Sequence, residues 1–166
     1  LYTTDFTICV SDFDESTVTA DTPAQLVEKL ARGKCLAVAK DHPGAVVLGC
    51  DTVVDVGGEV FGKPRSTEDA KRMLRALSGA THEVHTGVCV SDGLRTESFV
   101  DSCKVTFFPI PEEEIDAYTA TKEPYDKAGA YAIQGRAALW LDRLEGDYYT
   151  IMGLPVSRTA RLLGRF

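Results

Sequence analysis

Apolar and polar residues alternate along this chain with two different periods. Period-two alternation and short apolar runs predict strands over residues 6–10, 45–48, 52–56, 59–61, 83–90, 97–107 and 138–141. Apolar residues at helical spacing predict helices over residues 22–39, 66–77, 111–120 and 156–163. Helices separate some strands, whereas other strands follow one another directly. This order predicts an α/β or α+β protein with a mixed sheet.

Capping and turn residues support these boundaries. Thr22 offers a capping hydroxyl, and Pro23 after it suits the first helical position. Ser66 and Asp69 resemble a capping box for the second helix. The pair Gly57–Gly58 predicts a tight hairpin between residues 52–56 and 59–61.

Length and composition limit the kind of protein. A chain of 166 residues is long enough for one domain with a substantial core. No apolar run approaches the roughly 20 residues that span a bilayer. The first residues, 1–5, lack the basic start and apolar segment of a signal peptide. We therefore expect no membrane partner.

Cysteines and charge narrow the choice further. The five cysteines are widely spaced and form no CxxC, which favours reduced thiols in a cytoplasmic protein over disulfides or a zinc site. The net charge of −7 argues against binding of duplex nucleic acid. An anionic small substrate would need local lysines, arginines or a metal ion to offset that charge.

Two charged residues indicate phosphate chemistry. Asp51 follows an apolar run, so its carboxylate must be hydrogen-bonded, metal-bound or at the edge of a cleft. Lys63 lies between Gly62, which permits close approach of a ligand, and Pro64, which stiffens the loop. A turn aspartate and a solvated loop lysine are the alternatives that spacing alone leaves open.

A second charged group lies upstream. Asp12, Asp14 and Glu15 place three carboxylates within four residues, and such oxygens suit Mg²⁺. A solvated acidic loop is the alternative. Lys34 follows Gly33 inside a predicted helix, where glycine costs about 1 kcal/mol relative to alanine. This indicates either a ligand or another backbone close to Gly33, or a surface lysine beside a kink.

The segment EPYDKAGAYAIQG, residues 123–135, combines small and polar residues. Asp126, Lys127 and Gln134 could bind a base edge or a phosphate, and the amide of Gln134 offers both donors and acceptors. Signatures of other chemistries are missing, since the chain contains no GxSxG, GxGxxG or P-loop. Cys50 has no evident histidine partner, which favours a small buried apolar role for it.

Taken in order, these segments resemble the Maf family of nucleoside triphosphate pyrophosphatases, also described as septum-formation inhibitors. The matching pieces are VSDFDES (10–16), the lysine in LARGKCLAVA (30–39), VVLGCDTVV (46–54), GKP (62–64), LSGATHEVHTGV (77–88), EPYDKAGAYAIQG (123–135) and GDYYTIMGLP (146–155). They cover nearly the whole chain in the family's order, which makes the set specific.

The resemblance implies a fold and an activity. The fold is a single α/β domain, with a central mixed, strongly bent sheet flanked by helices and a cleft between two lobes, related to inosine triphosphatase. The activity is hydrolysis of a nucleoside triphosphate to the monophosphate and pyrophosphate, with a divalent metal cation, Mg²⁺ or Mn²⁺. It also implies a homodimer and a link to cell-division arrest.

The resemblance further implies roles for individual residues. Asp51 would accept a proton from the attacking water, and Glu15 with Asp51 would lie near the metal. Lys34 and Lys63 would hold the phosphates, while Thr52 and Gln134 would help to select the base. The forms AGAYAIQG and GCDTVV are similar to the subgroup that acts on dTTP and UTP.

One part of the family pattern has no match. The family begins with a strand and a Ser-x-Ser-Pro-Arg-Arg loop that supplies phosphate-binding groups, and residues 1–6 do not match it. The expectation is thus a single domain over residues 1–166 without that strand and loop, either in a partial sequence or in a protein that lacks the motif. In the second case, phosphate binding would lose its arginines.

Two other functions fit parts of the pattern. The unmatched arginine loop favours a nucleotide-binding regulator of cell division with little turnover. The related fold favours a pyrophosphatase for unusual purine nucleoside triphosphates.

Overall fold

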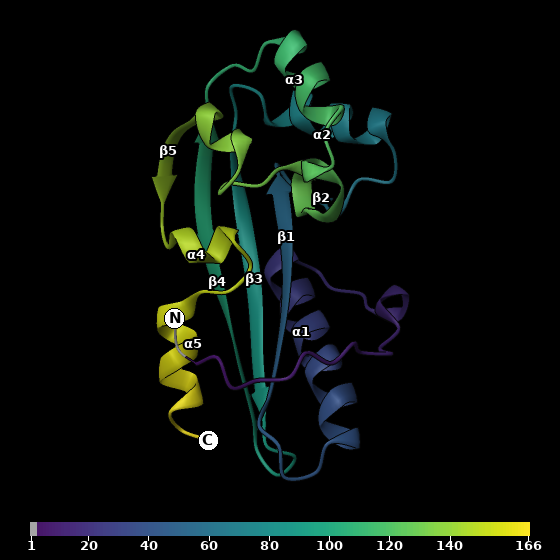
Figure 1. Ribbon diagram of the computed structural model, residues 1–166, viewed down its shortest axis with the longest axis vertical. Helices are drawn as coiled ribbons and strands as arrows, with labels where there is room; N and C mark the ends of the chain where they lie inside the picture. The colour runs from purple at the N-terminus through teal and green to yellow at the C-terminus, as the bar shows by residue number, and fades with distance from the viewer. Residues whose placement is uncertain (1–2) are drawn as a thin grey trace.

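The computed structural model describes residues 3–166 as an elongated molecule built on one five-stranded sheet (Figure 1). Its strands lie in the order β2-β1-β3-β4-β5. They are β1 (Val47–Val56), β2 (Glu59–Phe61), β3 (Thr81–Ser91), β4 (Thr96–Phe107) and β5 (Leu141–Glu145). The predicted α/β class is confirmed. Each pairing among these strands is antiparallel rather than mixed, and hairpins impose this direction on β1–β2 and β3–β4.

Residues 3–166 form five α-helices, and the first two begin where their capping residues predict. They are α1 (Pro23–Asp41), α2 (Thr67–Leu77), α3 (Glu112–Thr119), α4 (Tyr148–Ile151) and α5 (Val156–Leu163), with short 3₁₀ turns η1 (Glu15–Thr17), η2 (Glu123–Asp126), η3 (Ala128–Ala130) and η4 (Arg136–Trp140). The Thr22 hydroxyl accepts a hydrogen bond from the backbone N–H of Gln25, and Ser66 accepts one from Asp69. Both caps satisfy an N–H group that the first helical turn leaves free.

Strand β1 is longer than the sequence pattern predicts. The two strands expected at 45–48 and 52–56 are one continuous strand, and Asp51 lies in its middle rather than at a strand edge. Gly57 and Gly58, with φ of +60° and +95°, form the predicted turn into β2. Strand β2 pairs only with residues 54–56 of β1. In the described chain, residues 47–53 of β1 therefore have one edge without a strand partner.

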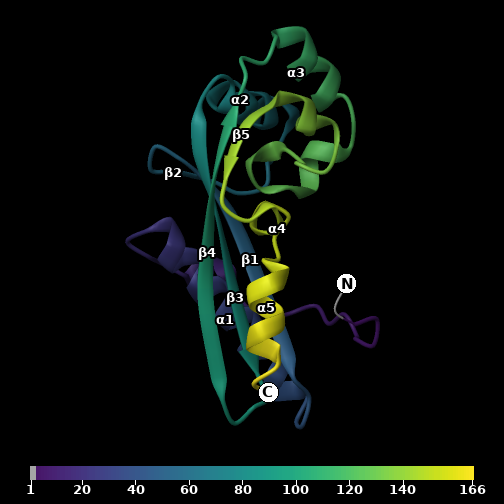
Figure 2. The ribbon, with the colours of Figure 1, turned by 90° about the vertical axis from the view of Figure 1, so that its left-hand side faces the viewer.

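Two hydrophobic clusters lie toward opposite ends of the long strands. The larger cluster, here called the upper lobe, packs α2, α3 and the turns of residues 123–140 on the sheet around Tyr118, Phe107 and Trp140. The smaller cluster, the lower lobe, joins α1 to β1 and β3 through Ala31, Cys35 and Cys89. Figure 2 shows the long strands running continuously from one lobe to the other.

Glycines bring α1 close to the sheet in the lower lobe. A Cβ at Gly87 would lie 2.3 Å from the Val27 carbonyl oxygen, and one at Gly49 would lie 2.7 Å from the Ala31 carbonyl oxygen. No side chain fits in these spaces without moving the helix backbone. The close approach places Lys34, one turn further along α1, over the middle of β1.

Two predicted strands differ from the structure. Residues 6–10 lie outside the sheet, and Phe6, Ile8 and Val10 are 67%, 84% and 96% exposed. The apolar side chains of this segment therefore do not form the buried face that alternation predicts. Residues 138–140 belong to the 3₁₀ turn η4, and the last strand begins only at Leu141. The turn buries Ala137 and Trp140, with Trp140 packed against Tyr118 and Phe107, and leaves Ala138 and Leu139 exposed.

The remaining bulk expectations concern thiols and membranes. All five cysteines are free in the structure. Within residues 3–166, none of the helices combines the length and the apolar character needed to cross a bilayer.

Candidate active site

Charged side chains from both lobes converge on one cavity of about 680 Å³. The lower lobe and the loop before it contribute Lys34 and Glu15, and β1 contributes Asp51. The upper lobe contributes Lys63 from the loop after β2, and Asp126 and Lys127 from the segment that contains η2. This cavity therefore unites residues that lie more than 100 positions apart in the sequence.

Lys34 is the centre of the charged group. Its ammonium nitrogen lies 2.5 Å from Asp51 Oδ1 and 3.1 Å from Glu15 Oε1. The Asp51 side chain is only 13% exposed, whereas that of Glu15 is 55% exposed. One cation thus joins a nearly buried carboxylate to a carboxylate that opens to solvent.

Gly33 explains how Glu15 reaches this position. A Cβ at Gly33 would lie 2.2 Å from the ring of Phe13, so the ring packs in the space that only glycine leaves. The close approach predicted at Gly33 is therefore that of an aromatic side chain. Asp14 then caps η1 by accepting hydrogen bonds from the backbone N–H and hydroxyl of Ser16. Of the three acidic residues in this loop, only Glu15 lines the cavity.

The surroundings of Asp51 and Lys34 change how both groups hold protons. Burial raises the pKa of the Asp51 carboxyl above its usual value, although the hydrogen bond from Lys34 opposes this effect. Burial disfavours the Lys34 ammonium, but hydrogen bonds to Asp51 and Glu15 outweigh it, so the pKa of Lys34 is raised. A carboxylate with a raised pKa is a stronger base, which suits removal of a proton from water.

A second cationic group lies on the upper side of the cavity. Lys127 Nζ contacts Asp126 Oδ2 at 2.6 Å, and this hydrogen bond, with a smaller contribution from Lys63, lowers the pKa of Asp126. The Gly62 carbonyl accepts a hydrogen bond from the N–H of Gly129, which ties the loop of Lys63 to the segment of Lys127. This backbone hydrogen bond therefore holds the segments of Lys63 and Lys127 next to each other.

Asp51 and Thr52 enter the cavity from opposite faces of β1. Adjacent side chains of a strand point to opposite faces. Asp51 is paired across the sheet with Gly87, beneath α1, whereas Thr52 is paired with Thr86 on the side of α4. Both residues line the same cavity, which therefore extends around the unpaired edge of β1. A ligand at this edge could contact the two faces at once.

The structure assembles most, but not all, of the predicted residues. Glu15, Lys34, Asp51, Thr52 and Lys63 share the cavity. Gln134 is exposed and is not part of the cavity lining among residues 3–166, so its role stays a prediction.

Other residues join the cavity without a role of their own assigned by the resemblance. Lys127 and Asp126 had only a general indication from their polar, glycine-rich segment. Gly153 lines the cavity next to Thr52, and a Cβ there would lie 3.3 Å from Thr52 Oγ1. Gly153 belongs to the matching segment GDYYTIMGLP, and that match did not indicate its proximity to Thr52.

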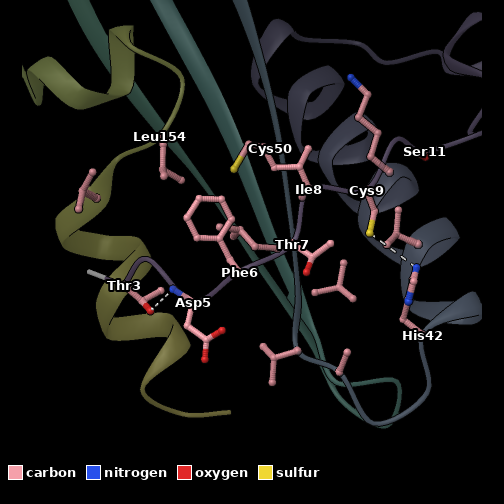
Figure 3. A pocket seen from close by; sticks show the side chains of 18 residues that line it. Thr3, Asp5, Phe6, Thr7, Ile8, Cys9, Ser11, His42, Cys50 and Leu154 are labelled. Carbon is pink, nitrogen blue, oxygen red and sulfur yellow. Dashed lines mark hydrogen bonds between the residues drawn. The ribbon is translucent and has the colours of Figure 1, made fainter. Parts of the chain in front are cut away.

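A larger cavity of about 1020 Å³ lies beside this one (Figure 3). The segment from Thr3 to Ser11 crosses it, with Phe6 and Ile8 among the residues that line it and Cys9 Sγ 3.7 Å from His42 Nε2. Apolar residues of β1 and of the turn before it, with Val38 of α1 and with Leu154 and Val156, form most of its remaining wall. Lys34 is the member of the charged group that this cavity shares, so the candidate site is the smaller one.

Glu15 and Asp51 suit a divalent cation. Both carboxylates already approach one positive charge, the Lys34 ammonium, and each retains a second oxygen. Carboxylate oxygens are the ligands that Mg²⁺ and Mn²⁺ prefer, and Mg²⁺ is commonly held by one or two carboxylates with substrate phosphates and water. Residues 3–166 contain no cluster of three or more His, Cys, Asp or Glu arranged for a metal. The fit is therefore to a cation shared between two carboxylates and a ligand.

The surroundings of Cys50 do not favour a nucleophilic thiolate. Burial, with a further contribution from the Asp51 carboxylate, raises the pKa of its thiol to about 12. The reactive thiolate is therefore scarce near neutral pH.

The fold and the cavity define an α/β domain with a cleft for an anionic ligand, in which lysines from two lobes face a pair of carboxylates. The sequence model of the family described as "Maf-like protein" matches residues 1–166. The chain belongs to this family. A curated relative from Bacillus cytotoxicus is 45% identical over 97% of this chain and 84% of its own length, and is named dTTP/UTP pyrophosphatase. A relative of the same name from Bacillus mycoides is also 45% identical over the same shares.

Proposed function

We propose that this protein is a nucleoside triphosphate pyrophosphatase that hydrolyses dTTP and UTP to the monophosphate and pyrophosphate. The observation that carries the proposal is the convergence of Asp51, Lys34 and Glu15 in a cleft that also holds Lys63 and Lys127. A nearly buried base beside several cations is what hydrolysis of a polyphosphate requires. The names of the relatives support the choice of dTTP and UTP.

Asp51 is the proton acceptor of the proposed reaction. Its carboxylate takes a proton from a water molecule whose oxygen attacks the α-phosphorus. The bond from the α-phosphorus to the bridging oxygen then breaks, and pyrophosphate leaves with the electron pair of that bond. The raised pKa of Asp51 favours this transfer, because the carboxylate holds the proton more strongly than an exposed one.

The lysines bind and orient the triphosphate. Lys34 reaches Asp51 from α1, and a phosphate oxygen at its ammonium would therefore lie near the base. Lys63 and Lys127 face the cavity from the other lobe and can neutralise the phosphates that leave. Glu15 and Asp51 would hold a Mg²⁺ or Mn²⁺ ion, which supplies further stabilisation of charge on the phosphate oxygens.

The test combines one substitution with a panel of nucleotides. Asp51→Asn keeps the size of the side chain but removes the base, so we expect pyrophosphate release from UTP with Mg²⁺ to fall about 10²- to 10⁴-fold. Asp55→Asn is the matched control, because Asp55 lies on the same strand, outside the cavity lining, and accepts a hydrogen bond from Gly58 that an amide oxygen can also accept. Full turnover in Asp51→Asn would refute the assignment of the base.

The same panel separates the alternatives. Faster release from ITP or 7-methyl-GTP than from UTP and dTTP would favour the purine-directed function. Thermal stabilisation by UTP without release of pyrophosphate would favour a nucleotide-binding regulator. The homodimer that the resemblance implies stays a prediction, and light scattering of the purified protein measures it.

A further inference from the structure

Three threonines on the α4 side of β1 form a connected set of hydrogen bonds. Thr52 Oγ1 lies 2.8 Å from Thr86 Oγ1, its cross-strand partner on β3. Thr86 Oγ1 donates to the backbone carbonyl of Thr150 at 2.7 Å. Thr86 and Thr150 are fully buried. These bonds lie behind the cavity, and only Thr52 among the three lines it.

Each hydroxyl in this set has a single proton, and this determines its direction. A carbonyl oxygen can only accept, so the proton of Thr86 is used in the bond to Thr150. In the bond between Thr52 and Thr86, the donor must then be Thr52. The Thr52 oxygen consequently turns its lone pairs, not its proton, toward the cavity.

The surroundings keep this direction in place. The Thr150 hydroxyl donates to Asp101 Oδ2 at 2.5 Å, and Asp101 also pairs with Arg158 on α5. These contacts hold the Thr150 carbonyl above Thr86. On the cavity side, Gly153 has a φ of +94° and no side chain, which leaves the Thr52 oxygen open to a ligand.

We propose that Thr86 is a positioning residue that makes Thr52 an obligate hydrogen-bond acceptor for the imide N–H of uracil or thymine. This inference rests on the proposed function and deepens it. Uracil and thymine carry a proton on N3, whereas cytosine has a lone pair there. The oxygen of Thr52 and N3 of cytosine are both acceptors, so neither would be paired if cytosine were bound. A site built for an N–H group therefore rejects bases that lack this group.

The test measures binding, so that it does not depend on turnover. The ligands are the α,β-imido analogues of UTP and CTP with Mg²⁺, which resist cleavage at the α–β position, and calorimetry gives their dissociation constants. For the unmodified protein we expect the UTP analogue to bind at least about tenfold more tightly than the CTP analogue. Equal binding of the two would overturn the inference, even if UTP is hydrolysed.

Three variants then separate positioning from structure. Thr86→Val removes the acceptor for the Thr52 proton, so that Thr52 can donate to cytosine, and the preference for the UTP analogue should fall about tenfold or more. Thr86→Ser keeps the hydroxyl, so this variant should retain the preference for the UTP analogue. Thr119→Val is the matched control, since Thr119 is buried and its hydroxyl also donates to a backbone carbonyl, that of Ile115, at 2.8 Å.

Each outcome decides the inference separately from the proposed function. An unchanged preference in a folded Thr86→Val protein, checked by its melting temperature, overturns the role of Thr86. If Thr86→Val does not fold, Thr86→Ser provides the test. Loss of the preference for the UTP analogue in that variant, which keeps the hydroxyl, contradicts the inference. Absence of pyrophosphate release from UTP by the unmodified protein refutes the proposed function and leaves the binding result to stand alone.

Discussion

The upper lobe and the lower lobe are each stabilised internally by a different kind of contact. The upper lobe has a broad core in which Tyr118, Phe107, Tyr131 and Trp140 meet edge to face. The lower lobe has a small apolar cluster and relies on contact between the backbone of α1 and glycines of the sheet. Apolar burial therefore stabilises the upper lobe, whereas close approach of backbone positions Lys34 in the lower lobe. Substitutions in the two lobes should consequently affect different measurements.

The largest effect in this comparison is expected at Gly87. A Cβ there would meet the Val27 carbonyl, so Gly87→Ala should move α1 away from β3 and Lys34 away from Asp51. Displacement by about 1 Å can cost about 100-fold in rate, and we expect a loss of that size in kcat/KM for UTP. Gly164→Ala is the control, because a Cβ there makes only an ordinary contact of 3.6 Å with the Ala160 carbonyl oxygen. Equal activity of the two variants would contradict the positioning role of the glycine.

The buried His82 side chain should make the stability of the upper lobe depend on pH. Burial lowers the pKa of its imidazole to about 4 from the ordinary value of about 6.5, and its Nε2 contacts the Tyr131 hydroxyl at 2.9 Å. Between these two values the unfolded chain binds a proton and the folded chain does not. Stability is therefore complete above about pH 6.5 and is lost as the pH falls toward 4, by about 2 kcal/mol between pH 7 and pH 5.

Urea unfolding at the two pH values measures this loss. His82→Gln carries no titrating ring, so its unfolding free energy should change by correspondingly less over the same interval. A parallel fall in both proteins would assign the pH dependence to other groups.

The smallest expected effect is at Thr159 in α5. Its buried hydroxyl finds no hydrogen-bond partner within residues 3–166. Thr159→Val has a similar shape and removes the unpaired group, so we expect stability to rise by about 1 kcal/mol, with turnover of UTP unchanged. Thermal unfolding detects the change, and a destabilised variant would show that the hydroxyl has a partner after all.

Local signals predicted much of this fold. Thr22 and Ser66 mark the starts of α1 and α2 because a capping bond involves residues only three positions apart. Gly57–Gly58 marks the β1–β2 turn for the same reason. The prediction of a strand at residues 6–10 was wrong. Alternation is typical of a half-buried strand, but the apolar side chains of this segment are exposed.

The candidate site was predicted in part. Ordered motifs indicated Glu15, Lys34, Asp51 and Lys63, which the structure brings into one cavity. The hydrogen bonds of Thr86 could not be predicted, because they depend on the register of β1 on β3 and on a carbonyl 64 residues away. The contact of Phe13 with Gly33 is likewise tertiary, and a mid-helix glycine alone does not identify its neighbour.

The position of Asp51 and Thr52 on opposite faces of β1 has a consequence for sequence change. A single residue inserted or deleted in this strand before Asp51 would exchange the two faces for every residue beyond it. In the proposed enzyme, the carboxylate would then lie toward α4 and the hydroxyl toward α1, so hydrolysis and base selection would fail together. We therefore expect β1 to accept conservative substitutions far more readily than any change in its length.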